Sequence, residues 1–295
     1  MMLRGTYTAL VTPFRDGAVD EDALERLLQF QVGEGIDGIV PCGTTGEAST
    51  LSYEEHERVI ALTVKSVGRK VPVIAGTGSN STKETIELTE TAKNLGADMA
   101  LVVAPYYNRP TQEGMYSHFK TLAEAVDIPL VLYNIPGRTG VNMLPDLVAR
   151  LARIPNIVAI KEASGSLQQV ADIFRLTGGT FPILSGDDNL FLPMMSVGAT
   201  GVISVLSNIM PARVKALGRA FLDEKDQEKA RSLHVELMPL FHAMFIETNP
   251  VPVKEALFSM GMMEKEVRLP LCNLAPQNSD FLKGVLRDYG LLQRE

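Results

Sequence analysis

The sequence predicts an α/β fold, a TIM (β/α)8 barrel followed by a C-terminal helical extension. Eight short runs rich in β-branched residues recur along the chain, separated by segments whose apolar residues lie three and four positions apart. Beyond about Lys225 the alternation stops and only helical patterns follow. Eight alternating units favour a closed barrel over an open doubly wound sheet, which usually has about six strands.

The expected strands begin near Thr6 (TYTALV), Asp37 (DGIV), Val71 (VPVIAG), Asp98 (DMALVVA), Pro129 (PLVLYN), Asn156 (NIVAIK), Phe181 (FPILSG) and Ala199 (ATGVIS). Between them, the helical pattern is clearest in 21–32, 53–64 and 82–96. Ser52 and Ser81 are each followed three residues later by a glutamate, so both are expected to begin helices as capping boxes.

We expect residues 1–224 to form the catalytic barrel and residues 225–295 the helical extension. Within the extension, 233–247, 252–262 and 281–292 have helical patterns. Their apolar faces imply that they pack on the barrel or on a neighbouring subunit.

Composition narrows the function classes. Two cysteines in 295 residues cannot build a disulfide framework, and no Cys/His spacing matches a zinc site. The net charge of −7 argues against a broad nucleic-acid surface. No signal peptide or membrane span is expected, which favours a cytoplasmic protein. Cys42 lacks a histidine motif that would activate it and fits a small buried residue better than a nucleophile.

Polar residues that end strands are the candidates for chemistry, because barrel active sites lie at the C-terminal ends of the strands. Lys161 ends one expected strand and Tyr133 ends the strand before it. Alternation places Ile157, Ala159 and Lys161 on one face. A desolvated amine can attack a carbonyl, and a phenol beside it can exchange protons. The alternatives are a lysine that reaches solvent and an ordinary core tyrosine.

Two loops add groups that could bind an anion. Thr44 and Thr45, between glycines, offer hydroxyls and backbone N–H groups for a carboxylate or a proton relay. A phosphate cradle is disfavoured because the P-loop pattern is absent, and loop 76–79 fits a turn with a helix cap. Arg138 follows Tyr133 closely and could bind a carboxylate through two hydrogen bonds, or remain a solvated loop arginine.

Three motifs resemble those of the dihydrodipicolinate synthase (4-hydroxy-tetrahydrodipicolinate synthase) family, within the N-acetylneuraminate lyase superfamily. They are Gly43-Thr44-Thr45-Gly46-Glu47, Tyr133-Asn134-Ile135-Pro136-Gly137-Arg138-Thr139-Gly140 and Ile160-Lys161-Glu162-Ala163. The resemblance covers nearly the whole chain. Arg138 in a G-R-T-G loop points to the synthases rather than to the sialic acid or sugar-acid lyases.

The resemblance implies a class I aldolase-type lyase of the diaminopimelate route to L-lysine. Lys161 would form a Schiff base with pyruvate, and the resulting enamine would add to L-aspartate 4-semialdehyde. Tyr133 would be the acid/base, linked through Thr44 to Tyr107 of a partner subunit. Thr45 and the backbone at Gly186 and Ile203 would bind the carboxylate of pyruvate. Arg138 would bind the carboxylate of the second substrate. No metal or organic cofactor is implied.

The resemblance also implies a homo-oligomer, a tight dimer usually within a tetramer, and allosteric inhibition by L-lysine. The matching effector positions are Ala48, Ser49, His56, Asn80, Glu84 and Tyr106. Tyr53 departs from a histidine found in some sensitive members. On the residues alone, a solvated helix face is the simpler interpretation of His56 and Glu84.

Two other functions remain open on the sequence. One is a different Schiff-base lyase that cleaves a 2-keto acid to pyruvate. The other is a pyruvate-binding regulatory protein without catalysis, against which the joint presence of Lys161, Tyr133, Thr44 and Tyr107 argues.

Overall fold

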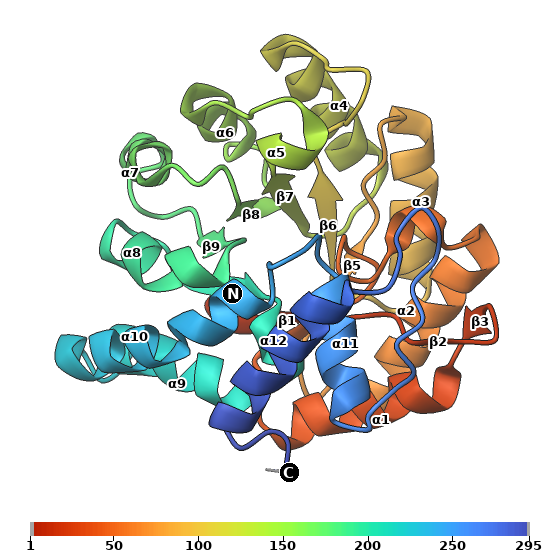
Figure 1. The fold of residues 1–295 in the computed structure, drawn as a ribbon. Helices are drawn as coiled ribbons and strands as arrows, with labels where there is room; N and C mark the ends of the chain where they lie inside the picture. The colour runs from red at the N-terminus through yellow and green to blue at the C-terminus, as the bar shows by residue number, and fades with distance from the viewer. Residues whose placement is uncertain (1–2, 294–295) are drawn as a thin grey trace.

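Eight parallel strands form the centre of the fold in a computed structural model that describes residues 3–293 (Figure 1). They are β1 (Gly5–Ala9), β4 (Gly38–Val40), β5 (Ile74–Gly76), β6 (Met99–Val103), β7 (Leu130–Asn134), β8 (Ile157–Glu162), β9 (Ile183–Ser185) and β10 (Gly201–Ser204). Their order in the sheet is β4-β1-β10-β9-β8-β7-β6-β5. The end strands meet at a bridge between Ile39 and Val73, where the Ile39 N–H donates to the Pro72 carbonyl (3.0 Å). The sheet closes, and the predicted barrel is confirmed.

A layer of helices surrounds the strands. It consists of α1 (Glu21–Gly33), α2 (Tyr53–Val67), α3 (Thr82–Asn94), α4 (Gln112–Ala125), α6 (Pro145–Leu151), α7 (Leu167–Leu176), α8 (Phe191–Ser196) and α9 (Pro211–Leu222). Ser52 forms the predicted capping box, accepting from the Glu55 N–H and donating its own N–H to the Glu55 carboxylate. Ser81 caps α3 by accepting from the Glu84 N–H. The Glu84 carboxylate accepts from the Tyr53 and Ser79 hydroxyls instead of the Ser81 N–H, so the second half of the predicted capping box is absent.

A small hairpin was not predicted. It joins β2 (Phe14–Arg15) to β3 (Ala18–Val19) through Asp16 and Gly17, which both have positive φ, 53° and 82°. Asp-Gly is a frequent hairpin turn because both central residues must adopt left-handed backbone conformations. Strands of two residues are too short to show alternation, so the turn was the only available signal.

A bulge in β8 changes which residues face the barrel interior. Leu130 of β7 pairs with Ile157 and Val131 pairs with Ala159, so Val158 is an extra residue. Ile157 consequently packs in the outer cluster, between the strands and helices, with Phe119 and Leu147. Val158 packs against the inner cluster, inside the barrel, which contains Val131 and Ala159. The expectation that Ile157 shares a face with Lys161 is wrong, because alternation restarts at Ala159.

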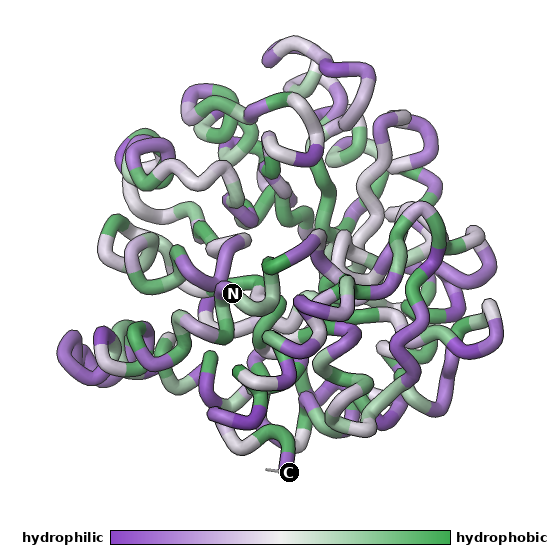
Figure 2. Tube along the Cα trace, in the orientation of Figure 1, coloured by the Kyte–Doolittle hydropathy of each residue, from purple (hydrophilic) through white to green (hydrophobic). Residues whose placement is uncertain are grey.

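Three further helices follow the barrel: α10 (Gln227–Ala243), α11 (Val251–Ser259) and α12 (Pro276–Asp288). Helix α10 packs on α9, and α11 lies beside α12 (Figure 1). Leu237, Leu240 and Leu282 share one buried cluster with Val202 of β10. Figure 2 shows hydrophobic residues concentrated on the inner elements and hydrophilic ones on the outer turns. The extension therefore shares a core with the barrel, while its exact division at residue 224 remains a prediction.

Between residues 3 and 293, no helix is long and apolar enough to cross a membrane.

A buried ion pair joins the C-terminal helices to the loop after β4. Lys254 Nζ of α11 lies 2.5 Å from Glu47 Oε1, and the two side chains are 0% and 1% exposed. The second Glu47 oxygen accepts from the Arg268 N–H (3.0 Å). Lys254 Nζ also lies 4.3 Å from the centroid of the Phe14 ring. Burial lowers the pKa of Lys254, and the charge of Glu47 opposes that shift.

Lys254→Met should strongly destabilise the protein, because it leaves the buried Glu47 carboxylate without a cation. We expect a loss of about 3–5 kcal/mol in the free energy of unfolding, measured with urea. Adding Glu47→Gln should recover much of that loss. The control is Lys120→Met, which breaks the exposed pair with Glu124 and should cost less than about 1 kcal/mol. A Lys254→Met protein as stable as the parent would contradict the prediction.

Candidate active site

Lys161 and Tyr133 lie side by side at the C-terminal ends of β8 and β7. The strand register pairs them directly. Lys161 Nζ lies 4.3 Å from the centroid of the Tyr133 ring, and the two residues are 6% and 5% exposed. The structure thus brings together the amine and the phenol that the sequence singled out, in surroundings from which most water is excluded.

Gly186, which follows β9, leaves room for the lysine side chain. A Cβ at this position would lie 3.2 Å from Lys161 Cε and 2.6 Å from Ala163 Cβ. Its N–H donates to the Glu162 carbonyl (2.8 Å) and is not free for a carboxylate. The Gly186 N–H is therefore not available to the carboxylate of pyruvate, contrary to the expectation from the resemblance. What Gly186 contributes here is the space left by its missing side chain.

Asp187 and Ile203 complete this side of the barrel. Asp187 is half-buried. Burial raises the pKa of its carboxyl group, and the positive charge of Lys161 offsets only part of that rise. Sequence reasoning missed Asp187, although its place just after a strand was a usable signal. Ile203 is fully buried on β10, opposite Tyr7 of β1, and belongs to the inner cluster.

The loop after β4 contributes Thr44 and Thr45. Thr44 is half-buried and Thr45 is buried. Cys42 is buried, its burial raises the pKa of the thiol, and its Sγ lies 3.7 Å from the His56 carbonyl. These features agree with the predicted small buried residue rather than a nucleophile.

Asn249, just before α11, links two predicted substrate-binding residues and was missed. Its Nδ2 donates to Thr45 Oγ1 (3.0 Å), and its carbonyl accepts from Arg138 Nη2 (3.0 Å). The residue is 6% exposed, and its Oδ1 has no partner among the described residues. The sequence places Asn249 in a segment assigned only to packing, so no local pattern identified it.

Arg138 and Tyr107 lie at the surface of the chain. Arg138 belongs to the short helix α5 (Pro136–Thr139), and the only side-chain hydrogen bond it makes among the described residues is the one to Asn249. Tyr107 is 89% exposed with φ 72°. Among residues 3–293 no hydrogen bond joins Tyr107 to Thr44 or Tyr133, and the relay through Tyr107 of a partner subunit stays a prediction.

Glu84 is one of the predicted effector positions. Its carboxylate accepts from the Ser79 hydroxyl and from the Tyr53 hydroxyl, which together lower its pKa. His56 is 5% exposed, and its Nε2 hydrogen-bonds to the Gly76 carbonyl (2.8 Å). Burial lowers the pKa of His56. A solvated helix face is therefore wrong for His56, and Glu84 is half-buried.

The other four predicted effector positions lie outside the α-helices and strands. Ala48 and Ser49 stand in the turn before α2, with Ser49 exposed. The Asn80 carbonyl accepts from Asn108 Nδ2 (2.9 Å), and Tyr106 is 38% exposed.

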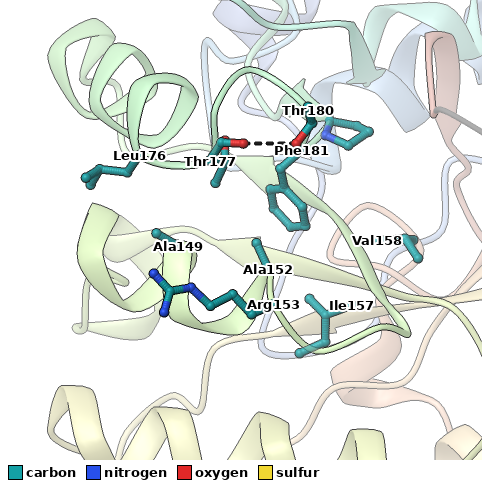
Figure 3. A pocket seen from close by; sticks show the side chains of 10 residues that line it. Ala149, Ala152, Arg153, Ile157, Val158, Leu176, Thr177, Thr180 and Phe181 are labelled. Carbon is teal, nitrogen blue, oxygen red and sulfur yellow. Dashed lines mark hydrogen bonds between the residues drawn. The ribbon is translucent and has the colours of Figure 1, made fainter.

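A separate cavity of about 590 Å³ lies between α6 and α7 (Figure 3). Ile157, Phe181 and Pro182 line it near the N-terminal ends of β8 and β9. Arg153 is its only charged lining residue. The cavity is therefore at the end of the barrel opposite to Lys161, where such folds carry stability rather than chemistry.

The closed barrel with a buried lysine beside a tyrosine at its C-terminal end defines a barrel enzyme of the aldolase type. The chain belongs to the dihydrodipicolinate synthetase family, whose model matches residues 2–288.

Similar proteins agree over the full length. The 4-hydroxy-tetrahydrodipicolinate synthase of Pelobacter propionicus is 58% identical over 99% of this chain and 100% of its own. The dihydrodipicolinate synthase of Aquifex aeolicus is 51% identical with a TM-score of 0.97, covering 99% and 100% of the two chains. The enzyme from Cyanidioschyzon merolae, solved with lysine bound, is 42% identical with a TM-score of 0.95 over 98% and 99%.

Proposed function

We propose that this chain makes 4-hydroxy-tetrahydrodipicolinate from pyruvate and L-aspartate 4-semialdehyde through a Schiff base on Lys161. The observation that carries the proposal is the buried Lys161 amine against the Tyr133 ring at the C-terminal end of the barrel. Full-length relatives with this activity in their names support the choice of reaction. They weigh against both the other Schiff-base lyases and the regulatory protein.

In the proposed reaction the Lys161 amine is first the nucleophile and finally the leaving group. The Lys161 amine attacks the keto carbon of pyruvate, water leaves, and the protonated imine withdraws electrons so that the methyl group loses a proton. The enamine adds to the aldehyde carbon. The amino group of the second substrate then attacks the imine carbon, closes the ring and expels Lys161. The imine nitrogen is the electron sink, so this chemistry requires no metal or organic cofactor.

We propose that Tyr133 exchanges protons at the reacting carbon and at the departing oxygen. In our proposal it passes protons through Thr44 to Tyr107 of a second copy of the chain. The 89% exposure of Tyr107 supports this arrangement, since a side chain so exposed is available to a neighbouring subunit.

The two substrate carboxylates have separate binding groups in this proposal. Thr45 and the Ile203 backbone bind the carboxylate of pyruvate, beside the space left by Gly186. Arg138 binds the carboxylate of the aldehyde with the guanidinium donors that Asn249 leaves free. Because Asn249 contacts both Thr45 and Arg138, it fixes the distance between the two sites.

We further propose a cytoplasmic homotetramer, a dimer of dimers, inhibited by L-lysine. The lysine-bound relative supports an effector site at Ala48, Ser49, His56, Asn80, Glu84 and Tyr106. Glu84 supplies the negative charge, and the neutral imidazole of His56 supplies packing rather than charge.

The Schiff base is tested by borohydride reduction in the presence of pyruvate. We expect a mass increase of one reduced pyruvate per chain, located by peptide mapping at Lys161 and absent from Lys161→Ala. Lys254, the other buried lysine, is an internal control because its amine is held by Glu47. An adduct at any other lysine, or none, would refute the proposed nucleophile.

Arg138→Ala should separate the two substrates. Loss of a charge-assisted contact to a carboxylate should raise KM for the aldehyde about 10- to 100-fold and leave pyruvate trapping on Lys161 unchanged. Steady-state kinetics with each substrate varied would measure both effects. Unchanged kinetics toward the aldehyde would favour a different lyase reaction.

Glu84→Gln should weaken inhibition by L-lysine, because it removes the charge proposed to bind the effector's amine. We expect the half-inhibitory concentration to rise at least about tenfold while activity without lysine stays the same. A dose–response curve compared with that of Glu87→Gln, an exposed glutamate on the same helix, measures the effect. Equal inhibition of both variants would place the effector elsewhere.

A further inference from the structure

We propose that Glu162 is a positioning residue for the reaction, a role that rests on the function proposed above. Its buried carboxylate holds the strand ends that carry Lys161 and Tyr133, and the loop after the Arg138 helix α5, in one polar network.

Glu162 lies directly behind the reactive pair. It ends β8, is 1% exposed, and pairs in register with Asn134, one residue beyond the pairing of Lys161 with Tyr133. Alternate residues of a strand face opposite sides, so Glu162 and Asn134 face the helices rather than the barrel interior. Asn134 Nδ2 donates to Glu162 Oε2 (3.0 Å). A side-chain bond therefore joins the two strand ends from outside the reaction space.

The same carboxylate holds the segment that follows β8. The Ser164 N–H donates to Glu162 Oε1 (2.6 Å), and Gln169 Nε2 of α7 donates to Glu162 Oε2 (3.1 Å). In these three hydrogen bonds the carboxylate accepts from uncharged N–H groups, and the Ser164 side chain also stabilises its charged form by a hydrogen bond. The neighbouring groups are hydrogen-bond donors, so they require two acceptor oxygens at this position rather than a partner for a cation.

The network extends to the loop after α5. Asn134 Nδ2 donates to Asn142 Oδ1 (2.7 Å), and Asn142 Nδ2 donates to Gln169 Oε1 (2.9 Å). The Met143 N–H donates to Asn134 Oδ1 (3.0 Å). Asn142 and Met143 lie in the loop that follows α5, the helix that carries Arg138. The position of Arg138 is thereby linked to the strand ends of Tyr133 and Lys161.

A glutamine at position 162 has the shape of glutamate but only one acceptor oxygen. Its NH2 group would face at least one of the three donors from Asn134, Ser164 and Gln169, and two donors repel each other. The strand ends would have to separate to relieve this contact. Shifts of about 1 Å can slow an enzymatic reaction roughly 100-fold.

The test is Glu162→Gln in the full-length protein, with pyruvate trapping by borohydride as a rate measurement. At saturating pyruvate we expect trapping on Lys161 to be about tenfold slower. KM for pyruvate should change less than about twofold, because Thr45 lies outside the network, and KM for the aldehyde should rise through Arg138. A loss of folded protein alone would reduce the amplitude of trapping and not its rate.

The matched control is Glu255→Gln. Glu255 is also buried (4% exposed) and accepts from the Ser279 hydroxyl (2.7 Å), but it joins α11 to α12. Parent-like trapping rates in Glu162→Gln, or equal slowing in both variants, would overturn the positioning role. Absence of an adduct in the parent protein would instead overturn the proposed Schiff base.

If Glu162→Gln does not fold, Gln169→Met provides the second variant. It removes one donor to Glu162 and three contacts to the loop after α5 while keeping a similar volume. We expect trapping about threefold slower, in line with the loss of part of the network. An unchanged trapping rate in this variant would also overturn the proposal.

Discussion

The pairing of β7 with β8 is the constraint on which the site depends. Its register sets Tyr133 opposite Lys161 and Asn134 opposite Glu162. Since neighbouring residues of a strand face opposite sides, the first pair enters the barrel and the second pair faces the helices. The reactive groups and their polar support are therefore built by the same backbone hydrogen bonds. A one-residue slip of β8 that set Glu162 opposite Tyr133 would leave a carboxylate where the amine is needed.

The strand order and the main reactive pair could be predicted because both follow from local patterns. Each β-branched run is continuous in the sequence, and the order of strands in a parallel barrel follows chain order. Lys161 and Tyr133 needed only alternation and adjacent strands. The same rule failed at Ile157, because the bulge at Val158 arises from the pairing with β7 and leaves no mark in the sequence of β8 itself.

Residues that act through distant contacts could not be predicted in this way. Asn249 lies 204 positions after Thr45, and nothing in its own segment indicates that the two side chains meet. His56 has the spacing of a helix surface residue, yet it is buried against the Gly76 carbonyl. Both cases depend on how separate elements pack, which a single sequence specifies only through the complete fold.

The ion pair between Glu47 and Lys254 also bears on the order in which the molecule can be completed during translation. Its partners are 207 positions apart, and the last barrel strand ends at Ser204. A nascent chain can therefore expose every strand of the sheet before the ribosome releases the lysine that neutralises Glu47. Until then the loop bearing Thr44 and Thr45 carries the Glu47 carboxylate without its cation, and burying that charge would be unfavourable. The loop bearing Thr44 and Thr45 can therefore take its final packing only after residue 254 has been translated.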